Sequence, residues 1–227
     1  MARLLSIMLT TLLLASVATG EKVKSFCEYG QGSSTQLSAA GGLWVQTWGT
    51  EAWEWFDCEA APNVGILGNN VVGLLQTWAT GLPEIDWTRM VVHLPLGGRL
   101  TLTAFGNTNT EEGAGQIIGN FQGVFVADGL ADHAEVDEEE GTIKIPFGAA
   151  VEEGPDGLIE VTETSGKFKS IYAVGPWEWH VNGKLTLLRV PGLPLQANIL
   201  AALQDPSLIL GAEEEIALTG SYYRTSQ

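Results

Sequence analysis

Short segments in which apolar and polar side chains alternate recur along the chain, and glycine, proline or asparagine separates them. Examples are residues 43–48, 71–80, 116–127 and 216–223, and neighbouring segments follow one another about every ten to fifteen residues. Successive side chains on a strand point to opposite faces of a sheet, so this pattern indicates strands with one buried face. We therefore predict an all-β fold, a single antiparallel β-barrel of about eight strands, with one short C-terminal helix at residues 196–204.

Residues 163–190 carry the densest set of strand and turn signals. Ser165-Gly166 predicts a turn, and residues 177–182 then alternate between an apolar and a polar set. Asn182-Gly183 offers the two positive φ angles of a type I′ turn. We expect residues 184–188 to return from this turn as an antiparallel strand.

Two other stretches are interpreted from their small and polar residues. Gly97-Gly98 predicts a break before a separate strand at residues 99–105. Residues 21–42 are polar and rich in glycine and serine, which favours irregular structure at the start of this stretch.

The N-terminus has the order of a secretory signal peptide. Arg3 supplies the positive charge, and residues 4–14 form an apolar run that is too short to span a bilayer. Small residues at positions 16–20 suit a signal peptidase. The sequence thus predicts a signal peptide at residues 1–20 and a secreted β-barrel domain at residues 21–227, either extracellular or periplasmic.

The chain contains two cysteines, Cys27 and Cys58. An even pair in an oxidising compartment usually forms a disulfide, and the enclosed loop would be about thirty residues long. The alternative is a pair of buried free thiols. We expect the disulfide.

The balance of charges limits the partners of the protein. Its formal net charge is −16, so nucleic acid and anionic membrane surfaces would be repelled, and we expect neither as a partner. The sequence has no Cys-x-x-Cys pair, phosphate-binding loop or His-Glu-x-x-His motif. We therefore predict no cofactor and no metal.

The tripeptide Trp-Glu-Trp occurs twice, at residues 53–55 and 177–179. On a strand the two indoles of each copy share one face and the glutamate lies on the other. Buried indoles would be either core packing or the walls of a pocket for an apolar or aromatic ligand. The candidate ligand-binding residues are Trp53, Trp55, Trp177 and Trp179.

The opposite arrangement would bury Glu178 and His180, which share a strand face. A buried carboxylate beside an imidazole has shifted pKa values and the chemistry for proton transfer, so these two residues are the catalytic candidates. Because burial of an unpaired carboxylate is costly, we expect the indoles inside, with Glu178 and His180 near the rim.

Two segments resemble a known family. Residues 113–121, GAGQIIGNF, resemble the glycine-rich entry strand of allene oxide cyclase/dirigent-like secreted barrels, and residues 161–171, VTETSGKFKSI, followed by Gly175, resemble their glycine-rich hairpin. The similarity covers about residues 98–190. Glu163-Thr164-Ser165 replaces the Gly-Gly-Thr of such hairpins, and no catalytic residue of the family has a match. The resemblance implies an eight-stranded barrel with an apolar mouth.

These observations lead to one function and two alternatives. We predict a secreted β-barrel protein that binds a small apolar or aromatic molecule. The first alternative, implied by the resemblance, is a dirigent/cyclase-like isomerase that acts inside the barrel. The second is an extracellular interaction or surface protein, because a fold alone does not define a function.

Overall fold

A computed structural model describes residues 22–38, 41–49, 66–67, 71–105, 113–128, 133–148 and 157–225 of the chain. These residues are mostly β-structure, as the sequence predicts, and all of the described strands belong to one antiparallel sheet. The strands are β1 (Lys24–Ser38), β2 (Gly41–Gly49), β3 (Val71–Ala79), β4 (Glu84–Asp86), β5 (Val91–Ala104), β6 (Gly115–Asp128), β7 (Glu135–Asp137), β8 (Thr142–Gly148), β9 (Gly157–Gly166), β10 (Ile171–Ala173), β11 (Trp177–Leu188) and β12 (Ile209–Arg224).

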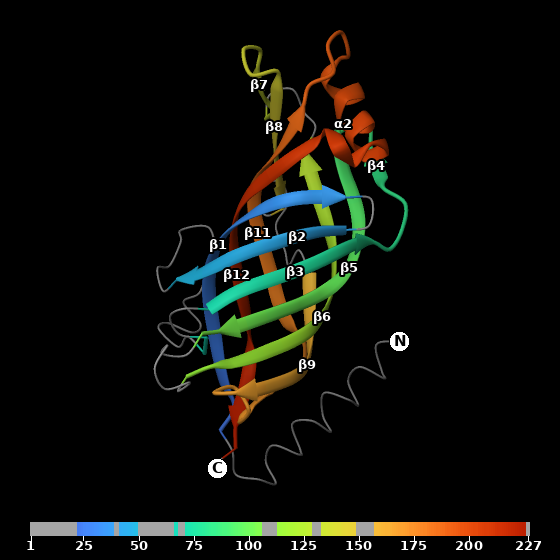
Figure 1. Ribbon diagram of the computed structural model, residues 1–227. Helices are drawn as coiled ribbons and strands as arrows, with labels where there is room; N and C mark the ends of the chain where they lie inside the picture. The colour runs from blue at the N-terminus through green and yellow to red at the C-terminus, as the bar shows by residue number, and fades with distance from the viewer. Residues whose placement is uncertain are drawn as a thin grey trace, which may run out of the picture.

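The strand pairings follow one continuous path through the sheet. Within the described residues the path is β12–β1–β2–β3–β5–β6–β9–β11, and every pairing is antiparallel. β11 also pairs with β12, so each of these eight strands has a hydrogen-bonded neighbour on both edges. Figure 1 shows β2, β3, β5 and β6 crossing in front of β11 and β12.

The shorter strands pair with the ends of strands in this path or with one another. β4 pairs with β5, β10 with β12, and β8 with β11, and β7 forms a hairpin with β8. Lys184 on β11 donates to Glu135 Oε1 of β7 at 2.6 Å, which ties this acidic hairpin to the sheet. In Figure 1 the β7–β8 hairpin and the helix lie together at one end of the molecule.

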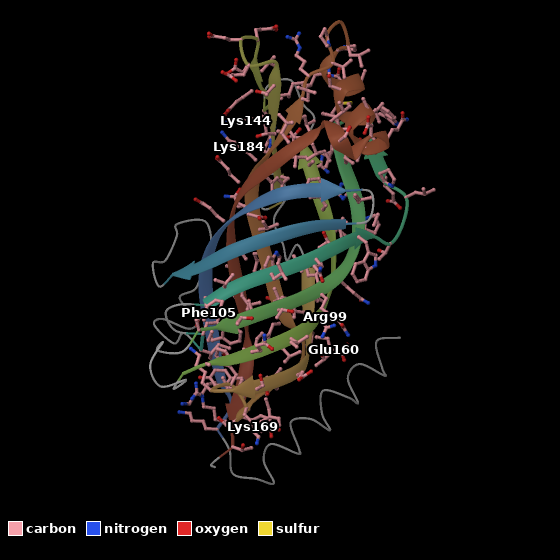
Figure 2. The ribbon with its side chains drawn as sticks, in the orientation of Figure 1. Arg99, Phe105, Lys144, Glu160, Lys169 and Lys184 are labelled. Atoms are coloured by element: carbon pink, nitrogen blue, oxygen red, sulfur yellow. The ribbon has the colours of Figure 1, made fainter. Side chains whose placement is uncertain are left out.

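Alternate side chains of the paired strands are buried together, and we call this set the buried face. Its members include Leu100, Leu102, Ile117, Phe121, Ile159, Trp177, Trp179, Ile216 and Leu218. Most of the described charged side chains on the strands lie on the opposite face, with Glu28, Asp128 and Glu214 buried. Figure 2 shows the labelled charged residues, Arg99, Lys144, Glu160, Lys169 and Lys184, projecting outward. Burial of apolar area on one face only is the arrangement that the alternating sequence pattern predicts.

The helix α2 (Leu195–Gln204) confirms the one helix expected from the sequence, and the 3-10 turn η1 (Pro206–Leu208) follows it. Asn198 holds the helix to the preceding chain. Its Oδ1 accepts a bond from Val190 N at 2.6 Å, and its Nδ2 donates to Leu193 O at 3.0 Å. In the described part of the chain, no helix has the length and hydropathy needed to cross a bilayer.

The expected turn at Asn182-Gly183 is wrong. β11 runs without interruption from Trp177 to Leu188, and residues on both sides of Gly183 keep their register with β12. A Cβ at position 183 would lie 2.4 Å from Glu213 O and 2.7 Å from Phe147 Cζ. Glycine is therefore required here by close packing rather than by a turn.

One further interpretation of small residues is wrong, and another holds only for residues 22–23, which have no regular structure. Gly97-Gly98 does not separate two strands but lies inside β5, where a Cβ on Gly98 would lie 2.2 Å from Gln76 O of β3. Residues 24–38, within the stretch expected to begin irregularly, form β1. In both places tertiary pairing overrides the local preference of glycine and serine for turns.

Trp177 packs into one end of the buried face. Its ring centroid lies 4.7 Å from that of Phe26 in an edge-on arrangement, and its Nε1 donates to Ser221 O at 3.2 Å. The indole lies over Gly220, where an added Cβ would be 2.3 Å from Trp177 Cδ1. The absence of a side chain at position 220 therefore makes room for the ring.

We predict that Gly220→Ala lowers the free energy of unfolding by about 1–3 kcal/mol, because the added methyl group overpacks the site against Trp177. Urea unfolding followed by circular dichroism measures this change. Gly81→Ala is the matched control, since its nearest neighbour, Pro95 Cγ, would be 3.4 Å away, and we expect a change within about 0.5 kcal/mol. Equal stability of Gly220→Ala and the unsubstituted protein would contradict this packing.

Cys27 lies half-buried on β1, and the described residues include no free cysteine. Its expected partner, Cys58, lies outside the described residues, so the disulfide stays a prediction. We expect alkylation of the denatured but unreduced protein to modify neither cysteine, and alkylation after reduction to modify both. Intact mass measurement distinguishes these cases, and modification without reductant would disprove the bond.

Candidate functional site

The indoles of the second Trp-Glu-Trp tripeptide belong to the buried face. Trp177 is 0% and Trp179 is 2% exposed, whereas Glu178 between them is exposed. On β11 the indole face is thus the inner one, as expected. Trp53 and Trp55 of the first tripeptide lie outside the described residues, so the expected group of four indoles is described only for Trp177 and Trp179.

Glu178 and His180 lie side by side on the outer face of β11. His180 Nε2 is 3.7 Å from Glu178 Oε2, and Thr219 Oγ1 of β12 donates to the same oxygen at 3.4 Å. The glutamate side chain is 53% exposed. The two side chains therefore form a surface contact, and the solvent around Glu178 limits how far they can act as a desolvated acid and base.

A cavity of about 30 Å³ lies against the buried face, and Trp179 forms part of its wall. Four aromatic rings line it, those of Phe121, Phe125, Phe147 and Trp179. The remaining lining is aliphatic except for Thr77 and Glu214. A volume of this size holds about two water molecules, or the end of a larger ligand. Val124, which also lines the cavity, is 40% exposed, so the cavity lies next to solvent on that side.

The aromatic walls come from three neighbouring parts of the sheet. Phe121 on β6 approaches Trp179 on β11 with 6.2 Å between ring centroids, and Phe125 approaches Phe147 on β8 with 5.1 Å. Offset and edge-on pairs of this kind stabilise one another by about 0.5–1.5 kcal/mol. The walls are therefore held in place by mutual ring contacts.

Glu214 brings a carboxyl group to this apolar cavity. It is 5% exposed, and its Oε1 finds no hydrogen-bond partner among the described residues. In the sheet register Glu214 lies between two glycines, Gly32 of β1 and Gly183 of β11. Neither neighbour has a side chain that could pair with the carboxyl group. Burial raises the pKa of Glu214 well above its ordinary value of 4.5, because the charged form loses its hydration.

Glu28, another buried carboxylate on the sheet, has partners. Its Oε1 accepts a bond from Leu67 N at 2.8 Å, and Lys167 Nζ donates to Leu67 O at 2.6 Å. Burial raises the pKa of Glu28, and the backbone amides of Leu67 and Ile66 and the charge of Lys167 lower it in part. Burial lowers the pKa of Lys167, and Glu28 acts against that shift. Glu28 therefore has a structural role, since it fixes residues 66–67 against the sheet.

Glu214 is the functional candidate that the sequence interpretation missed. The last strand is predicted to begin at Ile216, and the sequence interpretation assigns no role to residues 213–215. The signal was nevertheless present. Glu214 continues the alternation of Ile216, Leu218 and Tyr222 backward by two residues, and all four are buried.

Comparisons of the chain with family models, curated proteins and solved structures give no match. They leave the resemblance to allene oxide cyclase/dirigent-like barrels as a prediction. In the described ranges no group of three or more His, Cys, Asp or Glu side chains has the arrangement of a metal site. The geometry of the cavity therefore carries the functional argument.

We predict that the free energy of unfolding of Glu214→Gln increasingly exceeds that of the unsubstituted protein as the pH rises above about 4.5. A carboxyl group whose pKa is higher in the folded state binds more protons when folded, so its contribution is full below the unfolded pKa and is lost as the pH rises toward the folded pKa. Glutamine does not titrate and removes this loss. Thermal unfolding between about pH 4 and 8 measures the difference.

Glu213→Gln is the control for this prediction. Glu213 is the exposed neighbour of Glu214 on the opposite face of β12. We expect the free energy of unfolding of Glu213→Gln not to show the pH-dependent gain expected for Glu214→Gln. Parallel curves for Glu214→Gln and the unsubstituted protein would show that Glu214 has an ordinary pKa.

Proposed function

We propose that the protein is an exported β-barrel that binds a small, largely apolar or aromatic molecule in its interior, next to Trp179. The single observation that carries the proposal is a cavity lined by four aromatic side chains and by Glu214, whose Oε1 has no hydrogen-bond partner among the described residues. Apolar walls with a few polar groups are typical of small-molecule sites. Export rests on the N-terminal sequence pattern alone.

The barrel is part of the proposal. It would consist of the strands β12, β1, β2, β3, β5, β6, β9 and β11. Its support is that each of these strands is paired on both edges, with β11 and β12 joining the two ends of the path. Barrels of eight strands have an interior that side chains fill or that holds one small ligand. The resemblance to allene oxide cyclase/dirigent-like barrels implies the same number of strands.

The two ends of the proposed barrel would differ in role. Phe26, Phe168, Ile171, Trp177 and Tyr222 are nearly fully buried and pack one end, so Trp177 serves as core. The cavity lies toward the other part of the buried face, with Trp179 in its wall. Because its volume is small, a ligand would place one end inside the cavity and its remaining part beside Leu96, Val124 and Phe125.

A second candidate function is an isomerase or cyclase acting inside the barrel, and Glu214 is the observation that favours it. Burial raises the pKa of Glu214, and a carboxyl group with a raised pKa in an apolar cavity has the chemistry of a general acid when it is protonated. Glu178 and His180, the candidates from the sequence, lie on the outer face. In this reading the acid would be Glu214, and loss of turnover in Glu214→Gln with ligand binding retained would separate catalysis from binding.

Binding is tested by titrating the protein with neutral apolar and phenolic compounds while intrinsic tryptophan fluorescence is recorded. We expect saturable quenching by at least one of them. Trp179→Phe should weaken that binding up to about tenfold, because the smaller ring leaves a gap in the wall.

Trp78→Phe is the matched control, since Trp78 is 49% exposed on β3 and does not line the cavity. We expect its affinity to equal that of the unsubstituted protein. Absence of saturable binding throughout the panel would refute the proposed function. An equal loss in both variants would place the binding site elsewhere.

A further inference from the structure

The described residues that line the cavity include an acidic group and no basic one. Among the described residues that line it, Glu214 is the only side chain that titrates, and the other polar group is the hydroxyl of Thr77. Lys167 donates to Leu67 O beside Glu28, and Glu28 lies opposite Leu218 of β12 rather than opposite Glu214. The described lining therefore offers the carboxyl group no counter-charge.

We propose that the ligand carries a primary ammonium group, and that this group pairs with the carboxylate of Glu214 inside the aromatic cavity. The inference deepens the proposed function and rests on it, since it names the chemical class of the ligand. The ligand would be an amine with an apolar body, whose charged end enters the cavity and whose body lies toward Leu96 and Val124.

The aromatic walls favour a cation over a neutral polar group. Phe121, Phe125, Phe147 and Trp179 bring π-systems to the same space as the carboxyl group. The face of each ring is electronegative, and a desolvated cation over such a face is stabilised by about 0.5–2 kcal/mol. An ammonium group also has three donors, so it can satisfy Glu214 Oε1, which has no partner in the described part of the chain.

The size of the cavity and the charge of the chain also favour a primary ammonium group. A volume of about 30 Å³ admits a primary ammonium group more readily than a bulky quaternary one. The formal net charge of −16 attracts cations and repels carboxylate ligands of similar shape. A neutral alcohol would gain neither the ion pair nor this attraction.

Binding would be coupled to the release of a proton. Glu214 is protonated in the free protein below its raised pKa and must lose its proton to form the ion pair. No other titrating group faces it from the described lining. From β12 itself, Glu213 and Glu215 point to the opposite face, and from β1 and β11 the directly opposed residues are glycines.

The experiment compares n-hexylammonium with 1-hexanol, which have the same length but differ in charge, by calorimetric titration near pH 6.5. A primary alkylamine stays protonated below about pH 9, as lysine does. We expect n-hexylammonium to bind at least tenfold more tightly than 1-hexanol, and its affinity to rise with pH. Titration in two buffers with different ionisation enthalpies should reveal protons released upon binding.

Glu214→Gln is the deciding variant, because glutamine keeps the shape and the hydrogen-bonding capacity but not the charge. We expect it to lose at least tenfold in affinity for n-hexylammonium and to leave 1-hexanol unchanged, while Glu213→Gln affects neither. Circular dichroism confirms folding of each variant. The pH dependence and proton release of the unsubstituted protein provide a test that needs no variant.

Two results would overturn the inference. Equal or tighter binding of 1-hexanol, or an unchanged affinity of Glu214→Gln for n-hexylammonium, would reject the ammonium ligand but leave the proposed apolar binding function intact. Failure of both hexyl probes together with the neutral apolar and phenolic panel would reject the binding function as well.

Discussion

Pairing of β11 with β12 is the interaction on which the rest of the structure depends. It gives both strands a hydrogen-bonded neighbour on each edge, so neither leaves a row of unpaired amides and carbonyls. It also fixes which side chains are buried, because a shift of one residue in register would exchange the two faces. The positions of Trp179 and Glu214 on the same buried face follow from this register.

The two buried glutamates show how the same residue type can serve two purposes. Glu28 is surrounded by a backbone amide and a lysine whose ammonium group binds the adjacent carbonyl, so its burial is compensated within the fold. Glu214 has an oxygen without such compensation among the described residues, and its two directly opposed neighbours are glycines. A carboxyl group that only filled space would be replaced with advantage by leucine or methionine. This difference in partners is the physical reason why Glu28 has a structural role and why we propose a role in ligand binding for Glu214.

Sequence periodicity predicts what depends on local alternation and fails where distant strands meet. The all-β fold, the helix at Leu195–Gln204 and the inward direction of Trp177 and Trp179 follow from spacing along one segment. Asn182-Gly183 and Gly97-Gly98 predict breaks because the sequence shows that glycine can adopt positive φ angles. It does not show that Phe147 crowds Gly183 or that the β3 backbone crowds Gly98. The surroundings of Glu214 cannot be predicted from its own segment for the same reason. The residues next to it come from β1, β6, β8 and β11, which are distant in the sequence.

The glycines beside Glu214 connect the packing of the sheet to its chemistry. A side chain at position 183 would collide with Phe147, so this glycine allows an aromatic wall to stand next to the carboxyl group. Burial of the carboxyl group among the residues of this cavity raises the pKa of Glu214, because the charged form loses its hydration. Stability is lost by this arrangement at neutral pH, because a dry carboxyl group without a partner disfavours the folded state. A ligand that supplied a partner for the carboxyl group would recover that loss as binding free energy.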